Sequence, residues 1–476
     1  MRTKYRLFPT LFIAALLFKE GVAQVHFPVA ISGDKRYLVD KDNKPFPILG
    51  RTAWFIISQP ESGYKKFLKN TIEHGHNAIE MAVITHWPMG NHAPFSGNGE
   101  MPFVKRLNGR PWDGKLSYDS IKIQAPDFNT PNEKYWSFVD RFLEYCESQG
   151  VLVFMFPAYV GWNGEEQGWM RELVANGPTK VEAYGAWIAT RYKSRRNIVW
   201  MLLGDMGHFN AEQKSAEAAL IKGLKSVESQ LSVQYTAESF SGQNSADNVD
   251  FGHEMTLNAS YTWELKTPVP YIARKAYAHD PVMPSFLLEE PYDEEGPDGN
   301  NYNPNATQPV RRFQWWGWLS TIGGYISGNG YVWQFVDPIW QQHLNTQAAL
   351  DMSRLNQFIR SINWWELIPS GLNNMPTLII DPGNADTSAA YVSAAATPNG
   401  SLLVAYVPPI HQGSVTVNME VMPANVFGYW FDPTNGKYFP ARDSSSENRG
   451  ARTFTTPGKN SRGERDWVLL LSVNKK

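Results

Sequence analysis

The chain has 476 residues, and its 44 basic and 46 acidic residues give a formal net charge of −2. It has neither a basic excess nor a block of like charge, which argues against a nucleic-acid binder and against a solvating tail. The single cysteine, Cys146, excludes an intrachain disulfide, and we expect it to be a buried, inert thiol.

The first 23 residues have the layout of a signal peptide. Arg2, Lys4 and Arg6 precede an apolar run over 7–18, and small residues follow up to Ala23. The run is short for a membrane span. We therefore expect cleavage after Ala23, no transmembrane segment in the mature chain, and export to the periplasm, cell surface or medium. An uncleaved membrane anchor is the alternative.

Residues 24–368 alternate between short apolar runs and amphipathic stretches. The apolar runs predict strands at 47–57, 77–84, 151–157, 198–203, 233–237, 255–261, 283–288 and 325–333. The amphipathic stretches predict helices at 63–73, 133–149, 179–192, 211–230, 309–322 and 344–362. Strands that are apolar throughout and alternate with helices indicate a parallel sheet. Eight such units predict an α/β fold, a (β/α)8 TIM barrel.

Residues 369–476 have a different character. Short strands are expected at 401–407, 414–420, 426–431, 437–439, 452–455 and 467–473, with Gly, Pro and Asn turns between them. This pattern predicts a small antiparallel β-sandwich as a second domain. Trp364, Trp365 and Leu367 lie at the junction, so we expect the sandwich to pack against the barrel.

Carboxylates follow two strands that face each other across the mouth of such a barrel. Asp205 follows the fourth strand, and Glu289 and Glu290 follow the seventh. Active sites of these barrels lie at the carboxyl ends of the strands. Glycoside hydrolysis needs two carboxyl groups that flank the scissile bond. Only one of the two adjacent glutamates can face the mouth, and Glu238 after the fifth strand is a further candidate. The alternative is structural: a helix cap for Asp205 and an ion pair for Glu290.

Aromatic and polar side chains surround these strand ends. Aromatic residues make up 13% of the chain, and their ring faces suit the C–H faces of sugars. The side chains that we expect to hold substrate are Arg51, Trp54, His86, Tyr159, Trp263, Tyr292 and Trp333. A long loop over 85–132 follows the second strand and predicts a closed pocket for a chain end, although a surface excursion is the alternative.

Metal sites have little support in the sequence. The acidic loop over 293–298 does not match the spacing of a calcium loop, and a solvated loop explains it. His74, His76, His86 and His92 do not have the spacing of a common zinc site. We expect no metal and no cofactor.

Several segments resemble the apiosidase-type glycoside hydrolases, glycoside hydrolase family 140, whose barrel precedes a small domain named for collagen binding. The segments that carry this resemblance are 51–54, 197–205, 290–292, 311–316 and 430–436. The resemblance implies that Asp205 is the acid/base and that Glu290, the glutamate before Pro291, is the nucleophile. Leu203-Gly204 and Tyr292-Asp293 depart from the family pattern, which makes the sugar less certain than the reaction.

From these patterns we expect an exported, monomeric retaining glycosidase. Its partner would be a carbohydrate, an oligosaccharide or a polysaccharide from plant cell-wall pectin, and no nucleic acid. A non-catalytic carbohydrate-binding or adhesion protein on the same barrel is the alternative.

Overall fold

The computed structural model describes residues 25–87, 91–116, 124–164, 167–227, 233–262, 268–289, 291–294, 310–411, 413–423, 425–441 and 449–475. The predicted signal peptide lies outside these residues. Within them, no helix is both long enough and apolar enough to cross a membrane.

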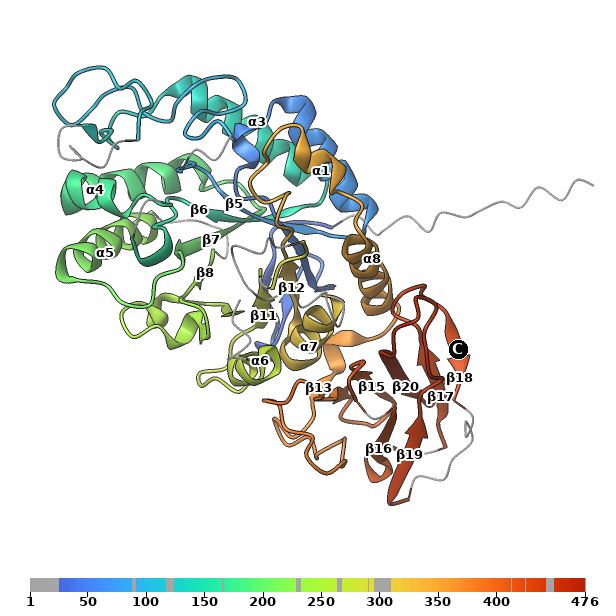
Figure 1. Cartoon of the computed structure of the whole chain (residues 1–476). Helices are drawn as coiled ribbons and strands as arrows, with labels where there is room; N and C mark the ends of the chain where they lie inside the picture. The colour runs from blue at the N-terminus through green and yellow to red at the C-terminus, as the bar shows by residue number, and fades with distance from the viewer. Residues whose placement is uncertain are drawn as a thin grey trace, which may run out of the picture.

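The larger part of the chain is a nearly closed α/β barrel (Figure 1). Its eight parallel strands are β4 (Ile48–Thr52), β5 (Ala78–Ala82), β6 (Leu152–Phe156), β7 (Ile198–Leu203), β8 (Gln234–Glu238), β10 (Asn258–Tyr261), β11 (Ser285–Leu288) and β12 (Ile322–Ser327). Strand β9 (Gln243–Asn244) adds an antiparallel edge to β10. The gap between β8 and β10 is bridged where the amides of Thr256 and Leu257 donate to the Tyr235 carbonyl. The predicted α/β barrel is confirmed in this form.

Seven α-helices of the described residues follow the strands and cover the outside of the barrel (Figure 1). They are α1 (Glu61–Glu73), α3 (Glu133–Ser148), α4 (Met170–Tyr192), α5 (Ala211–Lys225), α6 (Val269–Tyr277), α7 (Arg311–Thr321) and α8 (Gln347–Arg360). Helix α5 begins with a capping box, in which the Asn210 side chain accepts from the Gln213 amide and the Gln213 side chain accepts from the Asn210 amide.

The structure corrects two of the expected elements. Helix α6 was not among the expected helices; Pro270 stands in its first turn, where a proline removes no hydrogen bond within the helix. The expected eighth strand is present with other bounds, since β12 occupies 322–327 rather than 325–333. It ends because Asn329 turns the chain and accepts from the amides of Tyr331 and Val332.

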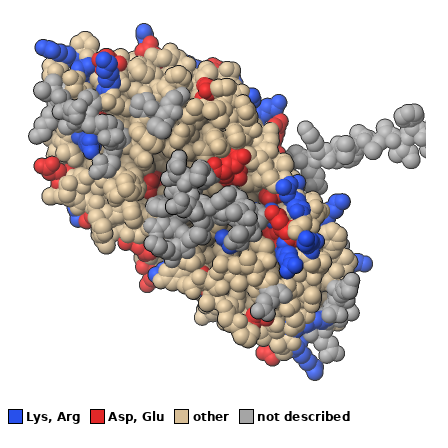
Figure 2. Space-filling view, in the orientation of Figure 1, with Lys and Arg blue, Asp and Glu red and all other residues tan. Residues whose placement is uncertain are grey.

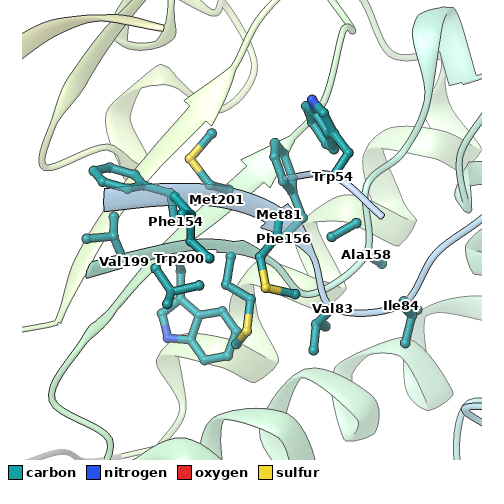
Figure 3. Close-up of a cluster of buried hydrophobic side chains, with 14 of the residues drawn as sticks. Trp54, Met81, Val83, Ile84, Phe154, Phe156, Ala158, Val199, Trp200 and Met201 are labelled. Carbon is teal, nitrogen blue, oxygen red and sulfur yellow. The ribbon is translucent and has the colours of Figure 1, made fainter. Parts of the chain in front are cut away.

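The barrel core is built from the apolar strands, which are buried on both faces. Figure 3 shows Met81, Phe154, Phe156, Val199, Trp200 and Met201 gathered between neighbouring strands. Burying each side chain of this size stabilises the fold by about 1.5–3 kcal/mol. A short antiparallel sheet of β1 (Ala30–Ile31), β2 (Leu38–Val39) and β3 (Pro45–Phe46) precedes the barrel.

The C-terminal region contains two antiparallel sheets that share one hydrophobic core. The larger sheet holds β13 (Ile368–Pro369), β14 (Ser393–Ala396), β15 (Leu402–Val407), β20 (Trp467–Ser472), β17 (Phe427–Phe431) and β18 (Tyr438–Pro440). The smaller sheet pairs β16 (Ser414–Asn418) with β19 (Ala451–Thr455).

This region packs directly on the barrel, as the junction sequence predicted. The rings of Trp315 in α7 and Tyr406 in β15 stack with centroids 5.8 Å apart. Trp364 and Leu367 are both buried in the same cluster. Arg311 of α7 adds a buried ion pair, with Nε 2.7 Å from Oδ2 of Asp466. The interface is therefore apolar with a charged centre.

Candidate active site

A pocket of about 290 Å³ lies at the carboxyl ends of the barrel strands. Its described walls contain no Lys or Arg, whereas three carboxylates and many aromatic rings face it. The lining residues are Trp54, Phe55, Ala82, Ile84, Thr85, His86, Trp87, Tyr159, Gln167, Trp169, Asp205, Glu238, Tyr261, Glu289, Tyr292 and Trp333. Figure 2 shows charged side chains of both signs scattered over one mostly uncharged face of the molecule.

Asp205 is held in the pocket by an unusual backbone. Leu203, Gly204 and Asp205 have φ of 63°, 126° and 51°, a run that places two non-glycine residues in the left-handed region. The Leu203 amide donates to the buried carboxyl of Glu217 on α5, at 3.2 Å. Strained backbone of this kind persists where the surroundings hold it, often at functional sites.

The contacts of Asp205 favour a carboxyl that can gain and lose a proton near neutrality. Burial raises its pKa to about 6, although hydrogen bonds from Tyr261 and Tyr159 lower it. The Tyr159 hydroxyl donates to Oδ2 at 3.1 Å. Oδ1 has no hydrogen-bond partner among the described residues. The group can therefore offer its proton to an incoming oxygen.

Glu289 follows β11 and is the neighbour of Glu290, which lies outside the described residues. Glu289 has a φ of 64° and is only 4% exposed. Its Oε1 accepts a hydrogen bond from Trp54 Nε1 at 2.6 Å and another from the Tyr292 hydroxyl. Hydrogen bonds to the charged form favour an ionised carboxylate. Glu289 is therefore held in one orientation by two donors that share its Oε1.

Two more glutamates stand beside Glu289. Glu80 of β5 and Glu238 of β8 are buried, and one carboxylate oxygen of each lies within 4.8 Å of the others and of Glu289. Burial raises the pKa of Glu238 well above its ordinary value, as do the charges of Asp205 and Glu289 and a hydrogen bond to Glu289. Such a cluster can hold shared protons, and its spacing could also suit a cation.

Aromatic rings form the walls of the pocket. Trp54 stacks on Phe156 at 5.0 Å and meets Tyr159 edge-on at 4.8 Å between centroids. Near the mouth, Trp87 and Trp333 stack at 6.4 Å with an interplanar angle of 26°. Flat, rigid rings of this kind suit the apolar faces of a sugar.

The other expected residues divide into three groups. Trp54, His86, Tyr159, Tyr292 and Trp333 line the pocket, and His86 Nε2 lies 3.2 Å from Oε1 of buried Glu172. Arg51 does not line it, because its Nη1 donates to Asn70 and the side chain borders a separate small cavity beside Asp293. Trp263 lies outside the described residues.

The structure also shows the surroundings of the other residues that the sequence analysis considered as possible sites. Cys146 is buried, and burial raises the pKa of its thiol well above the ordinary value, so it is not activated. His74 Nε2 lies 2.9 Å from the Asn345 side chain. In the acidic loop, Asp293 accepts from Thr346 and Asn329, and Glu294 pairs with His343, while 295–298 lie outside the described residues.

Sequence reasoning missed Glu80, Trp169 and Gln167. Glu80 was overlooked because only strand ends were searched, although one acid inside the apolar strand AIEMA was a usable signal. Trp169 and Gln167 come from the segment before α4, where no regular pattern marks them.

Gly204 supplies a test of this geometry. A Cβ at this position would stand 2.2 Å from the ring of Tyr159, on a φ of 126° that L residues rarely adopt. We expect Gly204→Ala to displace Tyr159 and Asp205 and to lower kcat by about 100-fold, the effect of a misplaced catalytic group. Gly33→Ala is the control, since a Cβ there meets nothing within 4 Å. Equal activity of the two variants would contradict the packing described.

Comparisons with known proteins match one family over the barrel and another over the C-terminal region. Residues 32–366 match the family described as "Apiosidase-like, catalytic domain", and residues 377–472 match one described as "Putative collagen-binding domain of a collagenase". No curated protein matches this chain. A solved structure titled "Glycoside hydrolase" superimposes with a TM-score of 0.72 and 17% identity, covering 94% of this chain and 98% of that chain. A glycoside hydrolase family 5 structure from Bacteroides vulgatus superimposes with a TM-score of 0.71 and 17% identity, covering 94% of this chain and 93% of that chain. At this identity the two structures show a shared fold.

Proposed function

We propose, from the premise that this chain belongs to the apiosidase-like family of catalytic domains, that it hydrolyses glycosidic bonds with Asp205 and a glutamate after β11. The observation that carries the proposal is the placement of Asp205 and Glu289 in one aromatic pocket. Two carboxyl groups in such a pocket are the machinery that glycoside hydrolysis requires.

We assign the role of acid/base to Asp205. Its pKa of about 6 leaves a protonated fraction near neutrality, and its Oδ1 is free of hydrogen bonds within the described part of the chain. The proton passes to the glycosidic oxygen as the bond to the anomeric carbon breaks. The resulting carboxylate then takes a proton from the water that completes hydrolysis.

We assign the role of nucleophile to Glu289 rather than to Glu290. Glu289 lines the pocket and accepts hydrogen bonds from Trp54 and Tyr292, which favour its charged form. Its carboxylate would attack the anomeric carbon and form a glycosyl ester, so that two inversions retain the configuration. This mechanism requires the two carboxyl groups to lie about 5–5.5 Å apart.

We further propose that the substrate is the end or a branch of a complex polysaccharide, with apiose-containing pectin as the first candidate. The pocket volume of about 290 Å³ lies near the lower limit of ligand sites. The rings of the stacked pair Trp87 and Trp333 would bind the sugar residue on the far side of the scissile bond. Export, through the signal peptide expected at residues 1–23, would bring the enzyme to such polymers.

Analysis of early products tests this function. The mature protein is incubated with pectic polysaccharides, and released sugars are separated by size. We expect a monosaccharide or a short side chain from the first minutes, because a pocket of about 290 Å³ has room for a chain end or a branch rather than for a long polymer. A ladder of long oligosaccharides would contradict the pocket. Binding without any release would favour the alternative of a non-catalytic carbohydrate-binding protein.

A further inference from the structure

Glu80 lies beneath the pocket rather than in it. It stands in the middle of β5, between Thr52 of β4 and Phe154 of β6 in the sheet register. Its side chain is 0% exposed, and it is not among the residues that line the pocket. A substrate therefore cannot touch it, and any effect on the reaction must pass through a neighbour.

The neighbours of the Glu80 carboxyl are other acids. One of its oxygens lies within 4.8 Å of carboxylate oxygens of both Glu238 and Glu289. Neither of its oxygens has a hydrogen-bond partner among the described residues. Burial raises the pKa of Glu80 well above its ordinary value, and the charges of Glu289 and Asp205 raise it further. Three ionised carboxylates cannot share this buried space without compensation.

We propose that Glu80 is a positioning residue that holds a proton beneath the pocket floor, so that the negative charge of the buried cluster resides on Glu289. The inference rests on the proposed function, because it explains how Glu289 stays ionised beside two other glutamates. Glu289 has donors in Trp54 and Tyr292, whereas Glu80 has no donor that would favour its charged form. The proton therefore belongs on Glu80.

The titratable groups that face this cluster come from several strands. They are Asp205 after β7, Glu238 at the end of β8, Glu289 after β11 and Tyr159 after β6. Arg51, one strand away on β4, interacts instead with Asp293 and Tyr325. Within the described residues the neighbours of Glu80 thus add negative charge, and a proton is the simplest compensation.

A measurement of thermal stability tests whether Glu80 holds a proton in the folded protein, and it does not depend on enzyme activity. The folded protein holds a proton on Glu80 that the unfolded chain releases above about pH 4.3. Stability from this group is therefore complete below that pH and is lost as the pH rises towards the raised folded value. Glu80→Gln keeps the shape and carries no charge. We expect its Tm to match the wild-type Tm near pH 4.5 and to exceed it by about 3 °C near pH 8.

The exposed Glu73→Gln variant, whose side chain is 60% exposed, is the control and should show no such pH dependence. A Tm difference between Glu80→Gln and the wild type that stays constant with pH would overturn the inference. So would a wild-type Tm that rises with Ca²⁺ or Mg²⁺ but not in Glu80→Gln, because the group would then be a charged metal ligand. Loss of the protonated-carboxyl infrared band in Glu80→Gln would support it.

Activity provides the second measurement. Glu80→Gln keeps the polarity and shape of a protonated carboxyl beside Glu289 and should retain kcat within about threefold, whereas Glu80→Met changes both and should lose about tenfold in kcat with KM little changed. If Glu80→Gln loses as much kcat as Glu80→Met does, the positioning role is overturned. If the wild type cleaves no sugar, the stability and infrared results still show whether Glu80 holds a proton. The proposed function can therefore fail without the inference about Glu80 failing, and the reverse also holds.

Discussion

Glu289→Gln should lower kcat/KM by about 10⁴-fold or more, which is about 5 kcal/mol of transition-state stabilisation. The amide keeps the shape and the hydrogen-bonding capacity of the side chain but cannot attack the anomeric carbon. Glu289 is the carboxylate that Trp54 and Tyr292 hold in the pocket. Hydrolysis rates on the pectic substrate, measured with Tm as a check on folding, give the answer.

Glu290→Gln is the matched control, because it makes the same chemical change at the adjacent residue. We expect its kcat/KM to stay within a few-fold of the wild-type value. The family resemblance, read from the glutamate before Pro291, implies the opposite order of effects. An inactive Glu290→Gln beside an active Glu289→Gln would return the nucleophile to Glu290.

Arg311→Met should destabilise the protein by about 3–5 kcal/mol, the typical effect of removing one partner from a buried ion pair. Arg311 is 1% exposed and contacts three acids: Asp351 of α8 at 2.9 Å, Asp466 at 2.7 Å and Glu464. Methionine fills much of the volume but leaves Asp466 buried without its cation and leaves Asp351 with Arg354 as its one remaining cation among the described residues. Denaturant unfolding measures the loss.

Arg196→Met is the control for that experiment. Arg196 also pairs with a glutamate, Glu147, but its side chain is 50% exposed. Exposed pairs contribute about 0–1 kcal/mol, so this variant should unfold near the wild-type midpoint. If Arg311→Met unfolds at the same denaturant concentration as Arg196→Met, the charged centre of the interface does not hold the two parts together.

Much of the barrel could be predicted because some of its strands are apolar throughout. Strand β7 is IVWMLL and β6 is LVFMF, and such runs have few alternatives to burial in a parallel sheet. The end of β12 was missed because a second apolar group, Tyr331 to Trp333, follows the short segment Gly328-Asn329-Gly330. Only the turn at Asn329, which depends on a side chain bonding to the backbone, stops the strand. The two-residue strands β1 to β3 carry too little pattern to predict.

The site could be predicted at strand ends but not below them. Asp205 was found because parallel strands deliver their carboxyl ends to one face of the barrel. Spacing alone could not choose between Glu289 and Glu290. The alternation of side chains along a strand does not continue through Glu289, because its backbone is left-handed. Glu80 was missed because its role depends on distances to Glu238 and Glu289, which come from strands far apart in the chain.

Azide rescue tests the central claim most directly, that Asp205 and Glu289 are the acid/base and the nucleophile. The substrate is an activated aryl glycoside of the sugar that the wild-type enzyme releases. Glu289→Ala leaves space for azide to attack the anomeric carbon directly, so the product should be a glycosyl azide of inverted configuration. Asp205→Ala still forms the ester on Glu289, so azide should give the retained configuration. Inverted azide from Glu290→Ala with none from Glu289→Ala, or inverted azide from Asp205→Ala, would contradict this assignment.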